Sequence, residues 1–290
     1  MSFRTVIVSS RAKLDSKMGY LVVRGEETKR VLLDEIETLV VEHPAVALTG
    51  CLLEDLVSRK VKVIFCDAAR NPVAELVPHH GSHDSASKIR TQIAWSSAVK
   101  AAVWQEIVSE KIRKQAALLE EHGKEREAAL LTSYIGQVQP LDASNREGHA
   151  AKVYFNALFG MGFTRTADTS VNAALNYGYS LILSAFNREI AANGYLTQLG
   201  IFHNNTFNHF NLGCDLMEPF RVLIDRQVSG WQPTAFGKAE KHMLWTVLEQ
   251  PVQIGGSKWV VSDAIKRYTR SAFTALNDQD VSALLFYDWI

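Results

Sequence analysis

Four residues carry side chains that together could bind a divalent cation. Asp215 and Glu218 lie three positions apart in CDLMEPFRVLID, so a helix would place both carboxylates on one face. Two carboxylates that face inward repel each other unless a cation or a shared proton joins them, which makes the pair a candidate metal site. Glu147, His203 and Glu218 come from three separate segments. Together they would supply oxygen, nitrogen and oxygen ligands for Mg²⁺ or Mn²⁺, with positions left open for water or phosphate oxygens.

Helix capping explains the same carboxylates as well as metal binding does. Ser144-x-x-Glu147 has the spacing of a capping box, in which the glutamate side chain accepts from the N-cap amide. Helical projection nevertheless places Glu147 on the core-facing side of the segment 144–160. Asp215 could cap a helix whose third residue is Glu218. Spacing alone therefore leaves both interpretations open.

Other kinds of site find less support. Three histidines lie between residues 79 and 83, but they have no carboxylate or thiolate at a fixed spacing, so a solvated hinge is favoured over a metal site. Cys51, Cys66 and Cys214 form no CxxC pair, which argues against disulfides and predicts a reducing, cytoplasmic location. Nucleotide-binding glycine motifs and the G-x-S-x-G motif of hydrolases are absent from the sequence.

The candidate ligands all fall in the second of two predicted regions. Residues 1–78 consist of short β-branched or aromatic-rich runs around one helix, which predicts a small, mainly β domain. Its predicted strands are 6–8, 20–23, 29–33, 38–41, 61–65 and 73–77, and its helix is 45–59. Residues 79–85 are polar and contain glycine, which predicts a linker. Residues 86–290 predict a larger, mostly α-helical domain, so the fold class is α+β.

Helical periodicity dominates after the linker. The predicted helices are 86–122, 124–136, 144–160, 171–193, 212–229, 235–249 and 262–276, with one β-hairpin over 252–261. The segment 171–193 is apolar on nearly all sides, which predicts a buried central helix in which Gly178 permits a close neighbour. Asn176, Tyr177 and Tyr179 in this helix could contact a ligand, but hydrogen bonds within the core are the favoured interpretation.

Composition and charge limit the function classes that remain. The 290 residues are 47% hydrophobic, which is typical of a globular protein. The apolar runs fall short of the roughly 20 residues of a membrane span, and MSFRTVIVSS does not resemble a signal peptide. Lys and Arg number 31, and so do Asp and Glu. This neutrality counts against a nucleic-acid partner.

Neither region is basic as a whole, because residues 1–78 hold 11 basic and 11 acidic side chains and residues 79–290 hold 20 of each. Binding to DNA would therefore depend on local clusters. The clusters are Lys111-Ile112-Arg113-Lys114, Lys124-x-Arg126 and Lys266-Arg267-x-x-Arg270. A solvated helix face is the simpler interpretation of each cluster.

Four motifs occur in the order and spacing of a known family. They are Asn145-Arg146-Glu147-Gly148-His149-Ala150-Ala151, Asn172-x-x-Leu175-Asn176-Tyr177-Gly178-Tyr179-Ser180, His203, and Asp215-Leu216-Met217-Glu218-Pro219-Phe220-Arg221. In these motifs the chain resembles the CRISPR-associated adaptation integrase, the metal-dependent DNA endonuclease that inserts new spacers into CRISPR arrays, and in particular its members from type II systems. Matches at IFCD, at His83-Asp84 and after Val261 extend the resemblance over nearly the whole chain.

The resemblance implies an N-terminal β domain, a linker and a C-terminal helical domain. It also implies that Glu147, His203 and Glu218 are catalytic residues that bind Mg²⁺ or Mn²⁺. Asp215 would then be an auxiliary carboxylate behind these ligands. The expected reaction is transesterification, in which the 3′-hydroxyl of a protospacer fragment attacks a phosphodiester at the edge of the repeat.

The same resemblance implies the partners. They are double-stranded DNA of the protospacer and the CRISPR repeat, a second copy of the chain in a homodimer, the family's small second adaptation protein and, as a further candidate, the RNA-guided effector nuclease. No membrane is expected. Arg146 and Arg221 adjoin predicted ligands and are expected to hold DNA phosphates. Two alternatives remain, namely a structure-selective, metal-dependent DNA repair nuclease and a non-catalytic DNA-binding scaffold whose carboxylates only cap helices.

Overall fold

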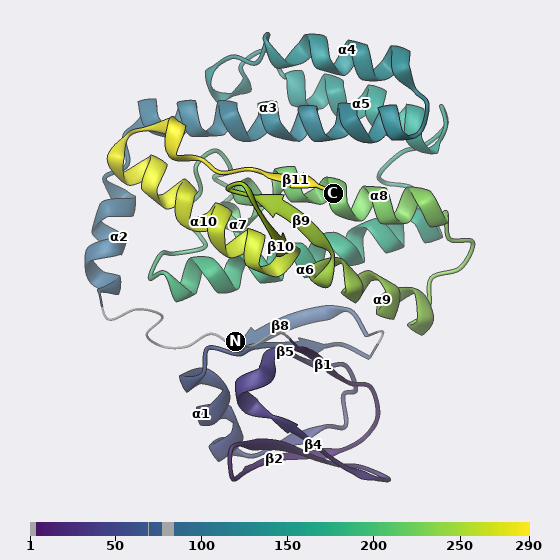
Figure 1. Ribbon diagram of the computed structural model, residues 1–290, viewed down its shortest axis with the longest axis vertical. Helices are drawn as coiled ribbons and strands as arrows, with labels where there is room; N and C mark the ends of the chain where they lie inside the picture. Colours follow the sequence, from purple (N-terminus) through teal and green to yellow (C-terminus); the bar gives the residue numbers. More distant parts are fainter. Residues whose placement is uncertain (1–3, 69, 77–83) are drawn as a thin grey trace. The chain divides into compact units, whose positions relative to one another are not determined.

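The computed structural model describes residues 4–68, 70–76 and 84–290. The chain divides into two compact units, Met1–Gly81 and Ser82–Ile290 (Figure 1). The first unit is rich in strands and the second in helices, so the predicted α+β fold class is confirmed. The three histidines between residues 79 and 83 lie outside the described residues. Within the described residues, no helix is long and apolar enough to cross a membrane.

The strands described in the first unit form two sheets. One has the order β1(Arg4–Val8), β5(Ile36–Val41), β7(Lys62–Cys66) and β8(Pro72–Leu76), in which the first three strands are parallel and β8 is antiparallel to β7. The other has the order β4(Thr28–Leu32), β3(Tyr20–Arg24), β2(Lys13–Lys17) and β6(Ala47–Leu48). The 3₁₀ turn η1(Leu33–Glu35) and the helix α1(Gly50–Ser58) complete the unit.

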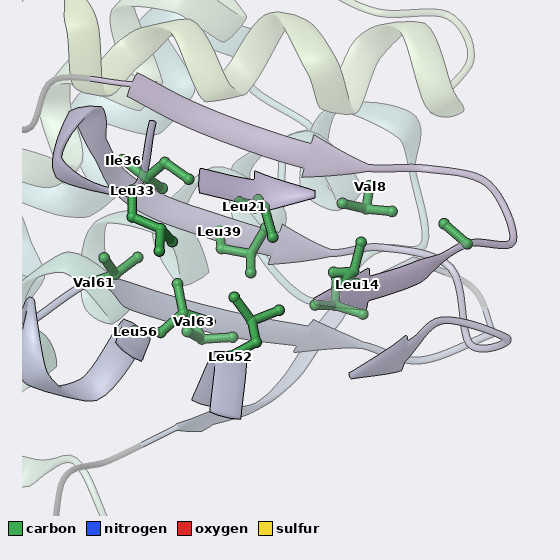
Figure 2. Close-up of a cluster of buried hydrophobic side chains, with 12 residues drawn as sticks. Val8, Leu14, Leu21, Leu33, Ile36, Leu39, Leu52, Leu56, Val61 and Val63 are labelled. Atoms are coloured by element: carbon green, nitrogen blue, oxygen red, sulfur yellow. The ribbon is translucent and has the colours of Figure 1, made fainter. Parts of the chain in front are cut away.

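An apolar cluster joins these elements. Figure 2 shows its buried side chains, which come from both sheets, η1 and α1. The strand β5 is buried along its whole length, as the apolar run LVV suggests for a central parallel strand. Leu52 and Leu56 bring the apolar face of α1 to the cluster, and both are fully buried.

Two local predictions for this unit are wrong. The strand β2 was missed because KLDSK is mostly polar, yet it pairs with β3 along its full length. The helix begins at Gly50 instead of Ala45, because Ala47–Leu48 pair with β2 and Thr49 forms the N-cap. The Thr49 hydroxyl accepts from the Leu52 amide at 3.3 Å.

Helices make up most of the second unit (Figure 1). They are α2(Ser85–Ile93), α3(Ser97–Glu121), α4(Glu125–Ile135), α5(Arg146–Phe159), α6(Ser170–Ala192), α7(Asn211–Leu216), α8(Arg221–Trp231), α9(Lys238–Trp245) and α10(Val261–Asp278). Short 3₁₀ turns are η2(Pro140–Asp142), η3(Glu218–Phe220), η4(Thr246–Glu249) and η5(Val281–Ala283). The predicted hairpin is present as β9(Pro251–Ile254) and β10(Ser257–Val260), and β11(Tyr287–Trp289), which was not predicted, pairs with β9.

Three predicted long helices are interrupted. The segment 86–122 divides into α2 and α3, because Ser96 is an N-cap that accepts from the Val99 amide at 3.2 Å. The segment 212–229 divides at η3, where Pro219 has no amide hydrogen to donate. The segment 235–249 becomes the shorter α9 followed by η4.

The helix α6 is buried in the centre of the second unit, as predicted. Its contacts include α8, α9 and α10. A Cβ atom added at Gly178 would lie 2.4 Å from Cγ2 of Ile224 on α8. Glycine at this position therefore allows the backbones of α6 and α8 to approach closely.

Candidate active site

Glu147 lies in the first turn of α5, and its carboxylate is not used to cap that helix. The amides of Arg146 and Glu147 donate to the two carboxylate oxygens of Asp142, at 2.8 and 2.9 Å. Ser144 instead donates its hydroxyl to the carbonyl of Gln137 at 3.2 Å. The capping box between Ser144 and Glu147 is therefore wrong, because Asp142 satisfies the first amides of α5.

Glu218 begins η3, between α7 and α8, and is buried without capping a helix. Lys111 Nζ donates to Oε2 of Glu218 and to Oε1 of Glu147, each at 2.5 Å. Arg221 Nε donates to Oε1 of Glu218 at 2.9 Å. Burial favours the neutral form of Glu218, but the charges of Arg221 and Lys111 outweigh it and lower its pKa to about 2.

Lys111 was expected on a solvated helix face, and this expectation is wrong. Its side chain is 10% exposed and lies on α3, which packs against both α5 and η3. Burial alone would lower the pKa of Lys111, but the carboxylates of Glu218 and Glu147 outweigh it and raise the pKa. Helical projection could have identified this residue, because Lys111 follows the buried Val108 by three positions and the buried Trp104 by seven.

Asp215 lies inside α7 and is fully buried, so it does not cap a helix start as the alternative interpretation required. Its carboxylate accepts from the amides of Ile201, Phe202 and His203 at 2.6, 3.0 and 3.1 Å. The same carboxylate faces His203 Nδ1 at 2.5 Å. One buried charge therefore fixes the loop 201–203 and the ring that it carries.

His203 lies on a loop, as predicted, and its side chain is 41% exposed. Because Nδ1 faces Asp215, Nε2 is the ring nitrogen left for a ligand. The hydrogen bond to Asp215 raises the pKa of His203 against the effect of burial. The negative charges of Glu218 and Glu147 raise it further, which places both carboxylates within electrostatic range of the ring.

The two arginines named from the sequence lie over tyrosine rings. The guanidinium of Arg146 is 5.3 Å from the ring centre of Tyr134, and its buried Nε has no hydrogen-bond partner within the described residues. The guanidinium of Arg221 is 4.7 Å from the ring centre of Tyr179. Each guanidinium therefore makes a cation–π contact that limits its movement, and Arg221 also contacts the carboxylate of Glu218.

Asp225 forms a buried polar cluster with Tyr154 and Tyr179. Its carboxylate accepts from Tyr154 Oη at 2.9 Å and from Tyr179 Oη. Burial raises the pKa of Asp225 to about 6, although both hydroxyls favour the charged form. Asn176 accepts from Arg165 at 2.6 Å. Tyr179 therefore makes the core hydrogen bond that was expected of it, whereas the Asn176 bond lies at an exposed position.

A cavity of about 480 Å³ opens beside His203. Lys100, Leu141 and Phe202 are among the residues that line it. Leu141 has a left-handed backbone with φ of 56°, and its side chain is 44% exposed. Phe202 is 42% exposed, and its ring stacks on the buried Trp104 with centroids 4.5 Å apart. The cavity therefore joins an apolar, aromatic wall to the imidazole.

The carboxylates suit a divalent ion only if Lys111 withdraws. Within residues 4–68, 70–76 and 84–290, no three His, Cys, Asp or Glu side chains stand grouped as a ready metal site. Glu147 and Glu218 instead converge on one cationic atom, the ammonium nitrogen of Lys111. Two carboxylates that already share a cation, with an imidazole nearby, are donors that fit Mg²⁺ or Mn²⁺.

Comparison with known proteins identifies the family. The model of the family described as CRISPR associated protein Cas1 matches residues 5–232. The CRISPR-associated endonuclease Cas1 of Neisseria meningitidis serogroup C (strain 8013) is 31% identical over 290 residues, which cover 98% of this chain and 95% of that protein.

Solved structures show the same fold. A casposase bound to its integration product superposes with a TM-score of 0.78 at 17% identity and covers 96% of this chain and 91% of its own. A Cas6-RT-Cas1–Cas2 complex superposes with a TM-score of 0.73 at 15% identity and covers 97% of this chain and 36% of its own. With the family model and the Neisseria relative, these matches confirm the resemblance drawn from the four motifs: the chain belongs to the Cas1 family of CRISPR-associated endonucleases.

Proposed function

We propose that the chain is a metal-dependent integrase of CRISPR adaptation that joins 3′-hydroxyl ends of protospacer DNA to the repeat by transesterification. The observation that carries the proposal is the convergence of Glu147 and Glu218, from two different elements, on a single buried cation, Lys111. The charges of both carboxylates also raise the pKa of His203. Neither carboxylate is used to cap a helix, which removes the basis of the scaffold interpretation.

Glu147, Glu218 and His203 Nε2 are the groups that would hold Mg²⁺ or Mn²⁺. When bound, such an ion would lower the pKa of the attacking hydroxyl and place a positive charge next to the reacting phosphate. Asp215 holds the His203 ring through Nδ1 and so keeps Nε2 available. This orienting role is the auxiliary role proposed for Asp215.

Arg146 and Arg221 are proposed to hold DNA phosphates beside the reacting bond. Their faces rest on tyrosine rings, so the N–H groups at their edges stay available for oxygens. Arg221 uses one of these groups on Glu218. The cavity beside His203 is proposed to admit the end of the DNA strand, because it connects solvent to the imidazole.

The proposed assembly is a homodimer that acts with a Cas2 protein on double-stranded DNA. The casposase neighbour is described as bound to an integration product, and a second neighbour is described as a Cas1–Cas2 complex. Both descriptions support a DNA-joining role and a Cas2 partner for this chain. A cytoplasmic location and an association with the RNA-guided effector nuclease stay predictions.

A strand-joining assay tests the function. A labelled duplex with a 3′-hydroxyl is incubated with a plasmid that carries the repeat, the Cas2 partner and Mn²⁺ or Mg²⁺. Glu147→Gln, His203→Ala and Glu218→Gln should each reduce joining by about 100-fold or more, because each removes a proposed ligand. Glu120→Gln is the matched control, since Glu120 is exposed on α3.

Two outcomes of this assay would reject the proposal, and each would indicate a different function. Cleavage of the repeat without joining would indicate a repair nuclease that uses the same carboxylates. DNA binding with neither cleavage nor joining, unchanged in all three variants, would indicate a scaffold.

A further inference from the structure

A second cavity, of about 460 Å³, lies on the outer side of α10. Its wall is formed by polar residues of α10, by Trp259 of β10, and by Ala283 and Leu285 at the end of η5 and just after it. The charged residues among them are Asp263, Lys266, Arg267 and Arg270. Three cationic groups against one carboxylate make this cavity positive in a chain whose net charge is zero.

Two of these cations have no carboxylate partner in the part of the chain that the structure describes. Lys266 Nζ pairs with Asp263 Oδ1 at 3.0 Å, so the single acid of the wall is already used. Arg267 and Arg270 form no ion pair with any described residue, and both are exposed. They lie three positions apart on one helix and so face the same direction.

Arg267 is held in a fixed orientation. Its guanidinium carbon lies 3.6 Å from the ring centre of Trp259, which is close stacking of the two planes. Stacking occupies the face of the guanidinium and leaves the N–H groups at its edge free to donate. The buried indole N–H of Trp259 also lacks an acceptor within the described residues. A positive wall whose N–H donors are not used by the described residues suits a ligand rich in acceptor oxygens.

We infer that this cavity binds a backbone phosphate of DNA through Arg267 and Arg270, as a contact separate from the carboxylate site. A phosphate offers two oxygens to the edge of one guanidinium and attracts the second. The planar fork of Arg suits this geometry better than the point charge of Lys does. The inference rests on the proposed function only in taking DNA as the ligand.

The salt dependence of DNA binding tests the inference. Each phosphate that an arginine neutralises adds about 0.9 to the slope of log affinity against log salt concentration. The affinity of the full chain for a labelled duplex is measured in EDTA, between about 50 and 200 mM salt. Replacing both residues by Gln removes the contact to one phosphate, so the slope should flatten by about one unit and binding should weaken at the lowest salt.

A matched variant separates this contact from general charge. Arg90→Gln with Lys152→Gln removes the same charge from exposed positions of α2 and α5 that belong to none of the basic clusters, and it should leave the slope within error of the unsubstituted protein. Arg267→Lys should keep the slope, because its charge remains, but should weaken binding, because the bidentate contact and the stacking are reduced. Melting curves of each variant establish that it is folded.

The inference would be overturned if both double variants flattened the salt slope equally, or if replacing Arg267 and Arg270 did not flatten it. If the arginine pair leaves DNA binding intact but abolishes binding to the Cas2 partner, the cavity binds protein carboxylates and the DNA assignment is wrong. The binding measurement uses no divalent ion. Its result can therefore be interpreted even if the joining assay rejects the integrase proposal.

Discussion

Removing the cation shared by Glu147 and Glu218 should destabilise the metal-free protein. Lys111→Met keeps the length and apolar stem of the side chain but removes the ammonium that contacts both carboxylates at 2.5 Å. Removal of one partner from a buried ion pair costs about 3–5 kcal/mol, because it leaves a buried charge uncompensated. Glu147 is 25% exposed and Arg221 still contacts Glu218, so the lower end, about 3 kcal/mol, is expected.

The assay is urea unfolding in EDTA and again in saturating Mn²⁺. In EDTA, the free energy of unfolding of Lys111→Met should be about 3 kcal/mol lower than that of the unsubstituted protein. Mn²⁺ should then stabilise the variant more than it stabilises the unsubstituted protein, because the ion no longer competes with an ammonium for the carboxylates. Lys152→Met, at an exposed position of α5, is the matched control and should change neither value. An unchanged stability in EDTA, or equal stabilisation by Mn²⁺, would refute this reasoning.

Three further predictions follow from separate contacts. Asp215→Asn should reduce strand joining by about 10–100-fold with little change in DNA affinity in EDTA, because it weakens the contact that orients the His203 ring. Equal losses of strand joining and of DNA affinity would contradict this orienting role. Asp225 has a folded pKa raised to about 6, so folding favours its protonated form, and stability should fall as pH rises from about 4 to 6. Urea unfolding should show a loss of about 2 kcal/mol across that window relative to Asp225→Asn, and parallel curves would refute the assignment. Gly178→Ala should lower the free energy of unfolding in urea by about 1–3 kcal/mol, because the added Cβ would clash with Ile224. Ile224→Ala should partly restore the stability, whereas no loss in Gly178→Ala would show that the two helices can move apart.

The parts of the fold that could be predicted are those with a strong local pattern. The all-round apolar character of α6 marks burial, and a glycine turn between two β-branched runs marks the hairpin β9–β10. The strand β2 gives no such signal, because KLDSK owes its conformation to pairing with β3 and β6. The break between α2 and α3 was not predicted, because apolar residues continue through it with helical spacing and so indicate one continuous helix.

The site shows the same limits. Glu147, His203, Asp215 and Glu218 were recognised from motifs, but spacing could not tell whether the carboxylates cap helices or face a cation. That choice depends on Asp142, which takes over the capping of α5 from a position five residues before Glu147. Lys111 was assigned to a solvated cluster because neighbouring charges look alike in a sequence, although its position on an apolar stripe identifies it as buried.

The most direct measurement is the anomalous diffraction of crystals soaked in Mn²⁺. If Glu147 and Glu218 form a metal site, a manganese peak will lie between their carboxylates, next to Nε2 of His203, and the ammonium of Lys111 will have moved away from both. A structure in which Lys111 still joins the two carboxylates at saturating Mn²⁺, with manganese bound elsewhere or nowhere in the unit, would contradict the account.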